Sequence, residues 1–358
     1  AHLLREQGVG GSNPLAPTIP RFRPLVSWPS PCSIASRWAR WPNRATLRPA
    51  PRARPALTEI AFKTSMSFRY GHPEPMAPGV VRVVAPNPSP FTFRGTNTYL
   101  VGTTALAVID PGPQDETHRA AILAAAAGRP ITHIVITHAH RDHSDGAPAL
   151  AAATGAPILA FGRGGERTRT EAAHMPSGKE FVDHSFTPDL RVAHGDEIKG
   201  ADWALEVLHS PGHAPDHLCL GLKGQRLVFS GDHVMAWNTT VIAPPEGRMS
   251  DYIGSLELLL KRRDRLYLPG HGGRLEKPLR TVKAYLVHRQ WREQAILAAI
   301  RDGAASIPEV VAIVYSTIDK RLVKAAALSV LAHVEYLADR RLVTCDGPLS
   351  LDQRFAPV

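Results

Sequence analysis

A short motif rich in histidine and aspartate is the part of the sequence that most directly predicts chemistry. Residues 137–146 read Thr-His-Ala-His-Arg-Asp-His-Ser-Asp-Gly and place four candidate metal ligands within six positions: His138, His140, Asp142 and His143. A strand pattern over 131–138 leads into the motif, and because alternate strand residues point the same way, His138 and His140 can converge on one cation. The turn that follows can bring Asp142 and His143 to a second position, since imidazole and carboxylate groups both bind zinc-like cations. One short loop can therefore serve two metal ions.

Three more candidate ligands follow later in the chain, each where a strand pattern ends in a turn with glycine directly before the ligand. They are His213, Asp232 and His271. A glycine lets the backbone turn sharply and approach an ion without a Cβ clash. Loops at strand ends are also where a rigid scaffold commonly presents catalytic groups. The sequence therefore offers five histidines and two carboxylates for one site.

The types of these ligands indicate the reaction class. No cysteine is among the seven, so the cluster suits zinc, our first choice, and also tolerates iron or manganese. Two cations about 3.5–4 Å apart can share a hydroxide, because they lower the pKa of water from 15.7 to about 7, and can neutralise charge on a carbonyl or phosphoryl oxygen. We therefore expect a metal-dependent hydrolase with two Zn²⁺ ions.

With these motifs the sequence resembles the metallo-β-lactamase-fold hydrolases. The resemblance covers most of residues 80–275 and includes Gly95-Thr-Asn-Thr-Tyr-Leu-Val-Gly102 and Ala107-Val-Ile-Asp-Pro-Gly112, which are similar to the family's opening strands. It implies one metal site from His138, His140 and His213, and a second from Asp142, His143 and His271. It also implies that Asp232 bridges the two ions, that Asp142 and Asp232 are catalytic, and that Asp110 supports the metal loop from beneath.

Four other histidines at or near strand ends are interpreted as structural. Lone histidines in such places are usually satisfied by local hydrogen bonds and do not bind metal. The four are His133, His209, His217 and His233.

Strand and helix patterns alternate around the ligand motifs. Strands are predicted at 79–84, 98–101, 105–109, 131–138, 157–161 and near 205 and 226, and helices at 116–127, 147–154 and 251–263. The polar stretch 163–188 is expected to be a surface loop or short hairpin near the site. Two sheets covered by helices fit this order, an α+β fold matching the four-layer αβ/βα sandwich that the resemblance implies. We place this catalytic domain at residues 66–275.

Residues 276–358 have a different pattern and are expected to form a small second domain. Helices are predicted at 282–300, 307–315 and 322–337, followed by short strands at 342–345 and 348–351 around Asp346-Gly347. This order resembles a winged helix, as in the C-terminal module of one branch of the family, whose eukaryotic mitochondrial member is a single-strand endoribonuclease. Residues 277–358 hold twelve Lys and Arg against eight Asp and Glu, an excess that can meet phosphates or simply be solvated. The third helix offers no interleaved exposed aromatics, which single-strand binders commonly use as stacking platforms.

Residues 1–65 carry most of the chain's formal net charge of +10, with ten basic and two acidic residues. The segment also holds ten prolines and shows no helical or strand period, so we interpret it as a disordered leader. We expect that translation starts at Met66 and that the leader comes from an extended reading frame. The alternative is an organellar transit peptide and a mitochondrial location, although the prolines interrupt the amphipathic helix that such a signal needs.

Cysteine usage and hydropathy bear on the compartment. Cys32, Cys219 and Cys345 lie far apart without metal or redox spacing, which fits a reducing compartment. No run of 18 or more apolar residues occurs, so no membrane span is expected. These observations favour a cytoplasmic protein.

Three functions are compatible with the sequence. The first is a dinuclear zinc phosphodiesterase that acts on single-stranded RNA, with nucleic-acid contacts through the C-terminal domain. The second is a thioester hydrolase of small-molecule esters resembling glyoxalase II, although the C-terminal helices do not resemble that family's second domain. The third is a non-enzymatic nucleic-acid-binding protein with structural metals, which is disfavoured because the ligands do not form a closed cysteine cage. β-Lactamase activity is not expected, because those enzymes generally carry cysteine, serine or a non-bridging residue where this chain has Asp232.

Overall fold

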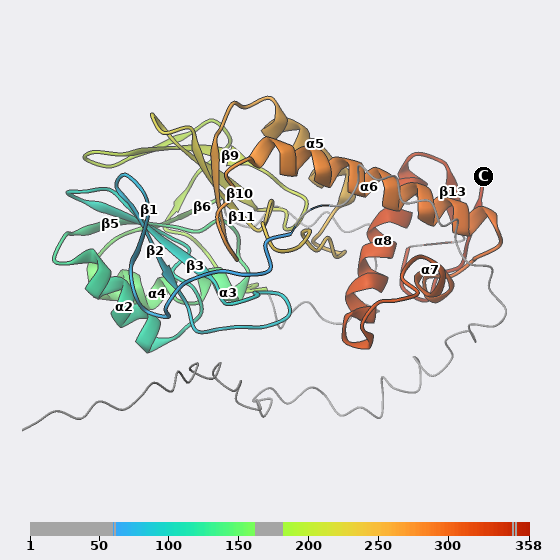
Figure 1. Cartoon of the computed structure of the whole chain (residues 1–358), viewed down its shortest axis with the longest axis horizontal. Helices are drawn as coiled ribbons and strands as arrows, with labels where there is room; N and C mark the ends of the chain where they lie inside the picture. The colour runs from blue at the N-terminus through green and yellow to red at the C-terminus, as the bar shows by residue number, and fades with distance from the viewer. Residues whose placement is uncertain (1–59, 61, 162–181, 346, 348) are drawn as a thin grey trace, which may run out of the picture. The chain divides into compact units, whose positions relative to one another are not determined.

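The computed structural model describes residues 60, 62–161, 182–345, 347 and 349–358, and its first sheet has seven strands (Figure 1). Their order in the sheet is their order in the chain: β1 (Glu74–Ala77), β2 (Val80–Val84), β3 (Asn97–Val101), β4 (Leu106–Ile109), β5 (Ile131–Val135), β6 (Ile158–Ala160) and β7 (Leu190–Arg191). The first four strands pair antiparallel, and β4 to β7 pair parallel. Parallel neighbours need crossover connections, which α2 (Glu116–Ala126) and α4 (Ala147–Thr154) provide.

The second sheet has five strands in the order β12-β11-β10-β9-β8. They are β8 (Glu197–Lys199), β9 (Ala204–His209), β10 (Leu218–Leu222), β11 (Leu227–Gly231) and β12 (Leu266–Pro269). Neighbours from β8 to β11 are antiparallel, whereas β11 and β12 are parallel and are joined through α5 (Met249–Leu260). Strands β1, β7, β8 and β10 were not predicted from the sequence.

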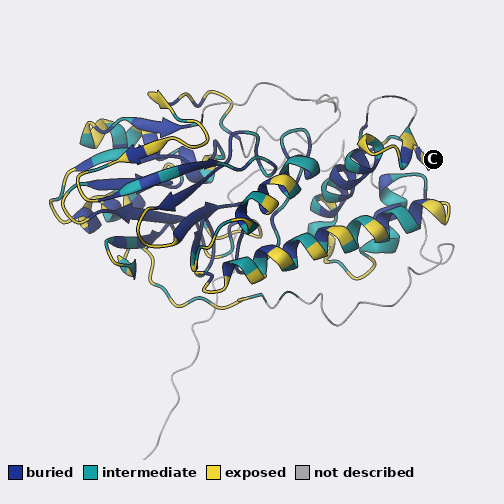
Figure 2. Cartoon of the chain, turned by 90° about the horizontal axis from the view of Figure 1, so that it is seen from above, coloured by how far each residue is buried: buried dark blue, intermediate teal, exposed yellow. Residues whose placement is uncertain are grey.

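Three apolar cores separate the layers. The first joins the two sheets and contains Tyr99 of β3 and Phe229 of β11, whose ring centroids are 5.2 Å apart. A second core packs α2 and α4 onto the first sheet, and a third packs α5 and α6 (Pro278–Arg301) onto the second sheet. The central strands of both sheets are buried, the outer strands β7 and β8 are largely exposed, and the helices show buried and exposed faces (Figure 2). The predicted four-layer αβ/βα sandwich is confirmed.

The strand that leads into the metal motif ends earlier than the predicted 131–138. Strand β5 ends at Val135, because the Asp110 side chain, and not a neighbouring strand, binds the Thr137 backbone N–H at 2.8 Å. The predicted turn is a short helix, α3 (Arg141–Ser144), which begins directly after His140.

The C-terminal residues form a winged helix with one strand in a different place from the prediction. Helices α6, α7 (Ile307–Val314) and α8 (Val323–Asp339) precede β13 (Val343–Cys345), as expected. The second wing strand is β14 (Phe355–Pro357), so the prediction of a strand at 348–351 was wrong. Leu349 and Leu351 are buried in the connection between the strands, which explains the apolar pattern that resembled a strand.

The folded chain includes residues that the sequence assigned to the leader. Ile60 and Phe62 pack against the core of α5 and α6, and the Lys63 backbone N–H donates to the Ala236 carbonyl at 2.9 Å. The alternating apolar residues of this short stretch explain why it packs, and the expected disorder does not extend to residue 65. The rest of the leader lies outside the described residues, as does most of the predicted loop at 163–188.

Across the part of the chain that is described, no helix has the length and apolar character needed to cross a membrane.

Packing between the two sheets should dominate stability. We expect Leu220→Ala, at a site with 0% exposure in β10, to lower the free energy of unfolding by about 2–5 kcal/mol, because it leaves a cavity. The matched substitution Leu123→Ala, at a residue of α2 that is 38% exposed, should change it by less than about 0.5 kcal/mol. Urea unfolding in the presence of a chelator measures both without a contribution from metal binding. Equal losses would contradict this assignment of the core.

Candidate metal centre

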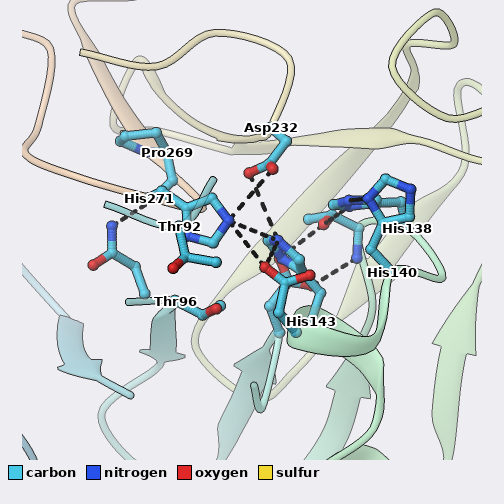
Figure 3. A network of polar contacts seen from close by, with 12 residues as sticks. Thr92, Thr96, His138, His140, His143, Asp232, Pro269 and His271 are labelled. Atoms are coloured by element: carbon cyan, nitrogen blue, oxygen red, sulfur yellow. Dashed lines mark hydrogen bonds and ion pairs between the residues drawn. The ribbon is translucent and has the colours of Figure 1, made fainter. Parts of the chain in front are cut away.

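All seven predicted ligands converge at one end of the two sheets. Three groups of ligand atoms lie within 4.8 Å of one another: His138 with His140 and His213, His138 with His143 and Asp232, and Asp142 with His143 and His271. Figure 3 shows five of these side chains close together: His138, His140 and His143 from the motif loop, Asp232 from the end of β11 and His271 from the end of β12. The groups share His138 and His143, so they form one continuous cluster.

The first half of the cluster is made of three imidazoles. Nδ1 of His140 lies 3.0 Å from Nε2 of His138 and 3.1 Å from Nε2 of His213. Nδ1 of His213 donates to the Val241 carbonyl oxygen at 2.7 Å, which leaves Nε2 of the neutral ring unprotonated. Burial lowers the pKa of His213 to about 4, so this ring is neutral and able to bind a metal at physiological pH.

The second half combines two imidazoles with carboxylates. Nε2 of His143 and Nε2 of His271 face each other at 3.3 Å. The opposite ring nitrogens contact acceptors, since Nδ1 of His143 lies 2.9 Å from Asp110 Oδ2 and Nδ1 of His271 lies 3.2 Å from the Gly95 carbonyl oxygen. Asp142 Oδ2 is 3.2 Å from Nε2 of His271. Burial would lower the pKa of His143, but the carboxylates of Asp142, Asp232 and Asp110 raise it to about 9, so this pocket favours positive charge.

Asp232 lies between the two halves. Its Oδ1 is 3.6 Å from Nε2 of His143, and its Oδ2 is 3.4 Å from Nε2 of His271 and 3.8 Å from Nε2 of His213. Oδ1 is buried and has no hydrogen-bond partner among the described residues. A buried carboxylate oxygen without a donor is costly unless a cation satisfies it. The residues therefore fit a divalent metal site, with Asp232 placed to contact both halves.

Asp110 holds the motif loop from beneath. Its side chain is 2% exposed and accepts hydrogen bonds from the backbone N–H and the hydroxyl of Thr137, at 2.8 and 2.7 Å, as well as contacting His143. A carboxylate behind a metal-binding histidine fixes the ring and its tautomer. The structure thus places Asp110 where the resemblance implied.

The sequence did not place two residues that lie beside the ligands. Glu246 Oε2 lies 3.8 Å from Nε2 of His140, on the side away from the ligand cluster. His217, predicted to be structural, is fully buried beneath the cluster, where its Nε2 accepts from the Asp232 backbone N–H at 3.1 Å. Neither has a spacing that relates it to the ligands, so no local signal in the sequence identifies them. His209 was also predicted to be structural, and it stacks on Phe161 and contacts the Pro215 carbonyl oxygen.

The glycines before the ligands are required for two different reasons. Gly212 and Gly231 have φ angles of +134° and +47°, which side chains rarely adopt. Gly270 is needed for space, because a Cβ there would lie 2.6 Å from Asp232 Oδ1 and 2.7 Å from Cε1 of His143.

The loop 232–241 is anchored by the first helix of the C-terminal residues. The Tyr285 hydroxyl of α6 donates to the carbonyl oxygens of Met235, at 2.7 Å, and Asn238. The Arg289 guanidinium, 4% exposed, donates to the Thr240 carbonyl oxygen, and the Thr240 hydroxyl donates to the Asp232 carbonyl oxygen at 2.7 Å. Because Val241 of the same loop orients His213, α6 supports two of the ligands.

Comparisons with known proteins identify the family of this fold. The sequence profile of the metallo-beta-lactamase superfamily matches residues 91–271, and that of the beta-lactamase-associated winged helix domain matches residues 306–348. Fold and site define a metal-dependent hydrolase. The chain belongs to the metallo-beta-lactamase superfamily and carries its associated winged helix domain.

Relatives cover most of the described chain. The chain is 30% identical over 272 residues to the beta-lactamase-like protein 2 homolog of Drosophila melanogaster, spanning 72% of this chain and 87% of that protein. It is 29% identical over 266 residues to the atrochrysone carboxyl ACP thioesterase of Aspergillus chevalieri, spanning 70% and 78%. A beta-lactamase domain protein from Burkholderia ambifaria has the same fold, with a TM-score of 0.69, 19% identity, and coverage of 87% of this chain and 100% of that chain.

The space at Gly270 gives a direct test of the cluster. We expect Gly270→Ala to displace Asp232 and His143 and to remove most of the bound metal from a folded protein, as measured by elemental analysis. Gly273→Ala is the matched control, because a Cβ there meets nothing within 4 Å. Full metal content in Gly270→Ala would show that the cluster does not hold the ions.

The anchoring of loop 232–241 gives a second test. We expect Arg289→Met to weaken metal binding about 10–100-fold, which is typical when a residue that orients metal ligands is lost. The substitution should also change the absorption spectrum of the Co²⁺-substituted protein. Arg292→Met on the same helix is the control, since Arg292 donates to the Val314 carbonyl oxygen at 3.2 Å, away from the loop. Competition with a chelator measures the affinity. Identical Co²⁺ spectra for the two variants would refute the role of Arg289.

Proposed function

We propose that this chain is a dinuclear zinc phosphodiesterase that cleaves single-stranded RNA. The observation that carries the proposal is the position of the Asp232 carboxylate, within 3.8 Å of ligand nitrogens in both halves of the cluster. A carboxylate shared in this way holds two cations close together and adds negative charge between them. That arrangement suits hydrolysis of a phosphodiester, in which charge develops on both the attacking and the leaving oxygen.

His138, His140 and His213 would hold one ion and Asp142, His143 and His271 the other, with Asp232 between them. When bound, the two ions lower the pKa of a water molecule and neutralise charge on a phosphoryl oxygen. Zinc is favoured because five of the seven ligands are imidazoles, which zinc binds well, while the two carboxylates would also accept iron or manganese.

Asp142 is the ligand most accessible to substrate. Its side chain is 28% exposed, whereas that of His271 beside it is 1% exposed. Burial would raise the pKa of Asp142, but His143 and His271 lower it overall, so the carboxylate stays ionised across the physiological range. We infer that Asp142 accepts a hydrogen bond from the attacking water and orients it toward the phosphorus.

The C-terminal domain supports a nucleic-acid substrate. Its winged helix profile matches residues 306–348, C-terminal to the last ligand, and residues 277–358 carry an excess of four positive charges. Such an excess attracts a polyanion over several ångströms and raises its rate of association.

Thioester hydrolysis is the second candidate. It is favoured by the relative named atrochrysone carboxyl ACP thioesterase, of which the match spans 78%. The same two ions can neutralise charge on a thioester carbonyl oxygen. The third hypothesis, a non-enzymatic binding protein, is set aside because the chain belongs to a superfamily of hydrolases.

A substrate panel separates the two reactions. We expect the zinc-loaded protein to cleave unstructured RNA and bis-p-nitrophenyl phosphate with a higher kcat/KM than acyl-thioesters. Asp142→Ala should lower kcat/KM for RNA by more than the roughly 10–100-fold that is typical when a residue that orients a metal ligand is replaced. Asp145→Ala is the matched control, because Asp145 directly follows the same short helix and pairs with Arg141, outside the cluster. Turnover of thioesters without cleavage of RNA would refute the proposal.

A further inference from the structure

An aromatic pair lies at the edge of the metal centre. Phe93 comes from the loop between β2 and β3, and Trp237 from the loop after β11. Their rings stack with centroids 5.1 Å apart and an interplanar angle of 14°. Neither ring belongs to the three apolar cores of the fold, and both are only partly buried.

Both residues are linked closely to the ligand His271. The carbonyl oxygen of Gly95, two residues after Phe93, faces Nδ1 of His271 at 3.2 Å. Trp237 lies over Gly272, where a Cβ would be 2.7 Å from Trp237 Cδ1, and Gly272 directly follows His271. Figure 3 shows Thr92 and Thr96 of the Phe93 loop beside His271. The stacked pair therefore borders the second half of the cluster.

The loop of Phe93 is held in a conformation that a bulky residue rarely adopts. Phe93 has a φ angle of 57°. Hydrogen bonds to Asn87 maintain it, since the Asn87 carbonyl oxygen accepts from the Thr92 hydroxyl at 2.6 Å and Asn87 Oδ1 accepts from the Thr96 backbone N–H at 2.9 Å. Strained residues that the surroundings hold in place concentrate at ligand-binding sites.

A cation accompanies the aromatic rings. The exposed side chain of Arg94 places its guanidinium carbon 5.2 Å from the Phe93 ring centroid. Tyr70, 40% exposed, donates through its hydroxyl to the Arg94 carbonyl oxygen at 2.8 Å. Aromatic faces combined with an arginine are the usual means by which proteins hold single-stranded nucleic acid, through base stacking and contact with phosphate.

We propose that Phe93, Arg94 and Trp237 form a subsite that stacks a nucleobase of single-stranded RNA next to the phosphodiester to be cleaved. This inference rests on the proposed function, because the subsite would bind the RNA substrate of that reaction. A nucleobase is favoured over an uncharged acyl group because the exposed guanidinium beside the rings matches a chain that alternates bases and phosphates. The subsite would supply a stacking surface that the sequence did not predict on the third helix of the winged helix domain.

The test measures binding separately from cleavage. A fluorescein-labelled single-stranded oligoribonucleotide with hydrolysis-resistant phosphorothioate linkages is titrated into the full-length, zinc-loaded protein, and fluorescence anisotropy gives Kd. The double substitution Phe93→Leu and Trp237→Leu should raise Kd about 5- to 150-fold, the range expected for losing one stacked base. Arg94→Gln should raise it and also flatten its dependence on salt. An oligonucleotide with abasic sites should bind both proteins equally weakly.

The integrity of the metal centre is checked without a substrate. The zinc content of the double variant and the absorption spectrum of its Co²⁺-substituted form should match those of the unsubstituted protein. If metal is lost or the spectrum changes while RNA binding weakens, the aromatic pair is a scaffold of the metal centre and the subsite is refuted. An unchanged Kd for RNA also refutes it, even where the unsubstituted protein cleaves RNA. If the double substitution raises Kd for RNA but the unsubstituted protein does not cleave RNA, the result counts against the proposed reaction and not against the subsite.

Discussion

The structure depends on bringing unprotonated imidazole nitrogens and carboxylates to about 3 Å from one another in a buried place. Lone pairs of His140, His138 and His213 converge, and Nε2 atoms of His143 and His271 face each other at 3.3 Å. Without positive charge between them such groups repel, and Asp232 Oδ1 lacks a hydrogen-bond donor within the described part of the chain. Bound cations would remove both costs at once. In our proposal their charge would also lower the pKa of water and make the phosphorus of a phosphodiester more electrophilic. Stability of the site and its chemistry therefore come from the same interaction.

The sandwich meets this requirement by ending strands of both sheets at one edge. The motif loop follows β5 of the first sheet, while Asp232 and His271 follow the parallel neighbours β11 and β12 of the second. Parallel neighbours end on the same side, so the two ligands arrive together without long connections. Close approach then depends on glycine, above all on Gly270, where no Cβ fits. Asp110 completes the arrangement by ending β5 and orienting His143 through one carboxylate.

The C-terminal helices belong to this arrangement as much as to a winged helix. Tyr285 and Arg289 hold the carbonyl groups of a loop that carries Asp232, Trp237 and the acceptor of His213. The same loop thus serves the metal ions at one end and, in our proposal, the substrate base in its middle. Linking the two modules through a loop of the site allows the position of α6 to affect both metal binding and substrate binding.

The sequence by itself determined the seven ligand types, the glycine turns before three of them, and the order of most strands and helices, because these depend on local spacing and periodicity. It misplaced the second wing strand, since buried leucines at 349 and 351 imitate a strand pattern, and it missed β10, whose residues are buried on both faces and do not alternate. Only the tertiary structure decided that Glu246 and His217 lie against the ligands, that Arg289 supports them, and that Phe93 meets Trp237. Those residues are brought together by packing between layers, over separations at which no sequence period relates one side chain to another.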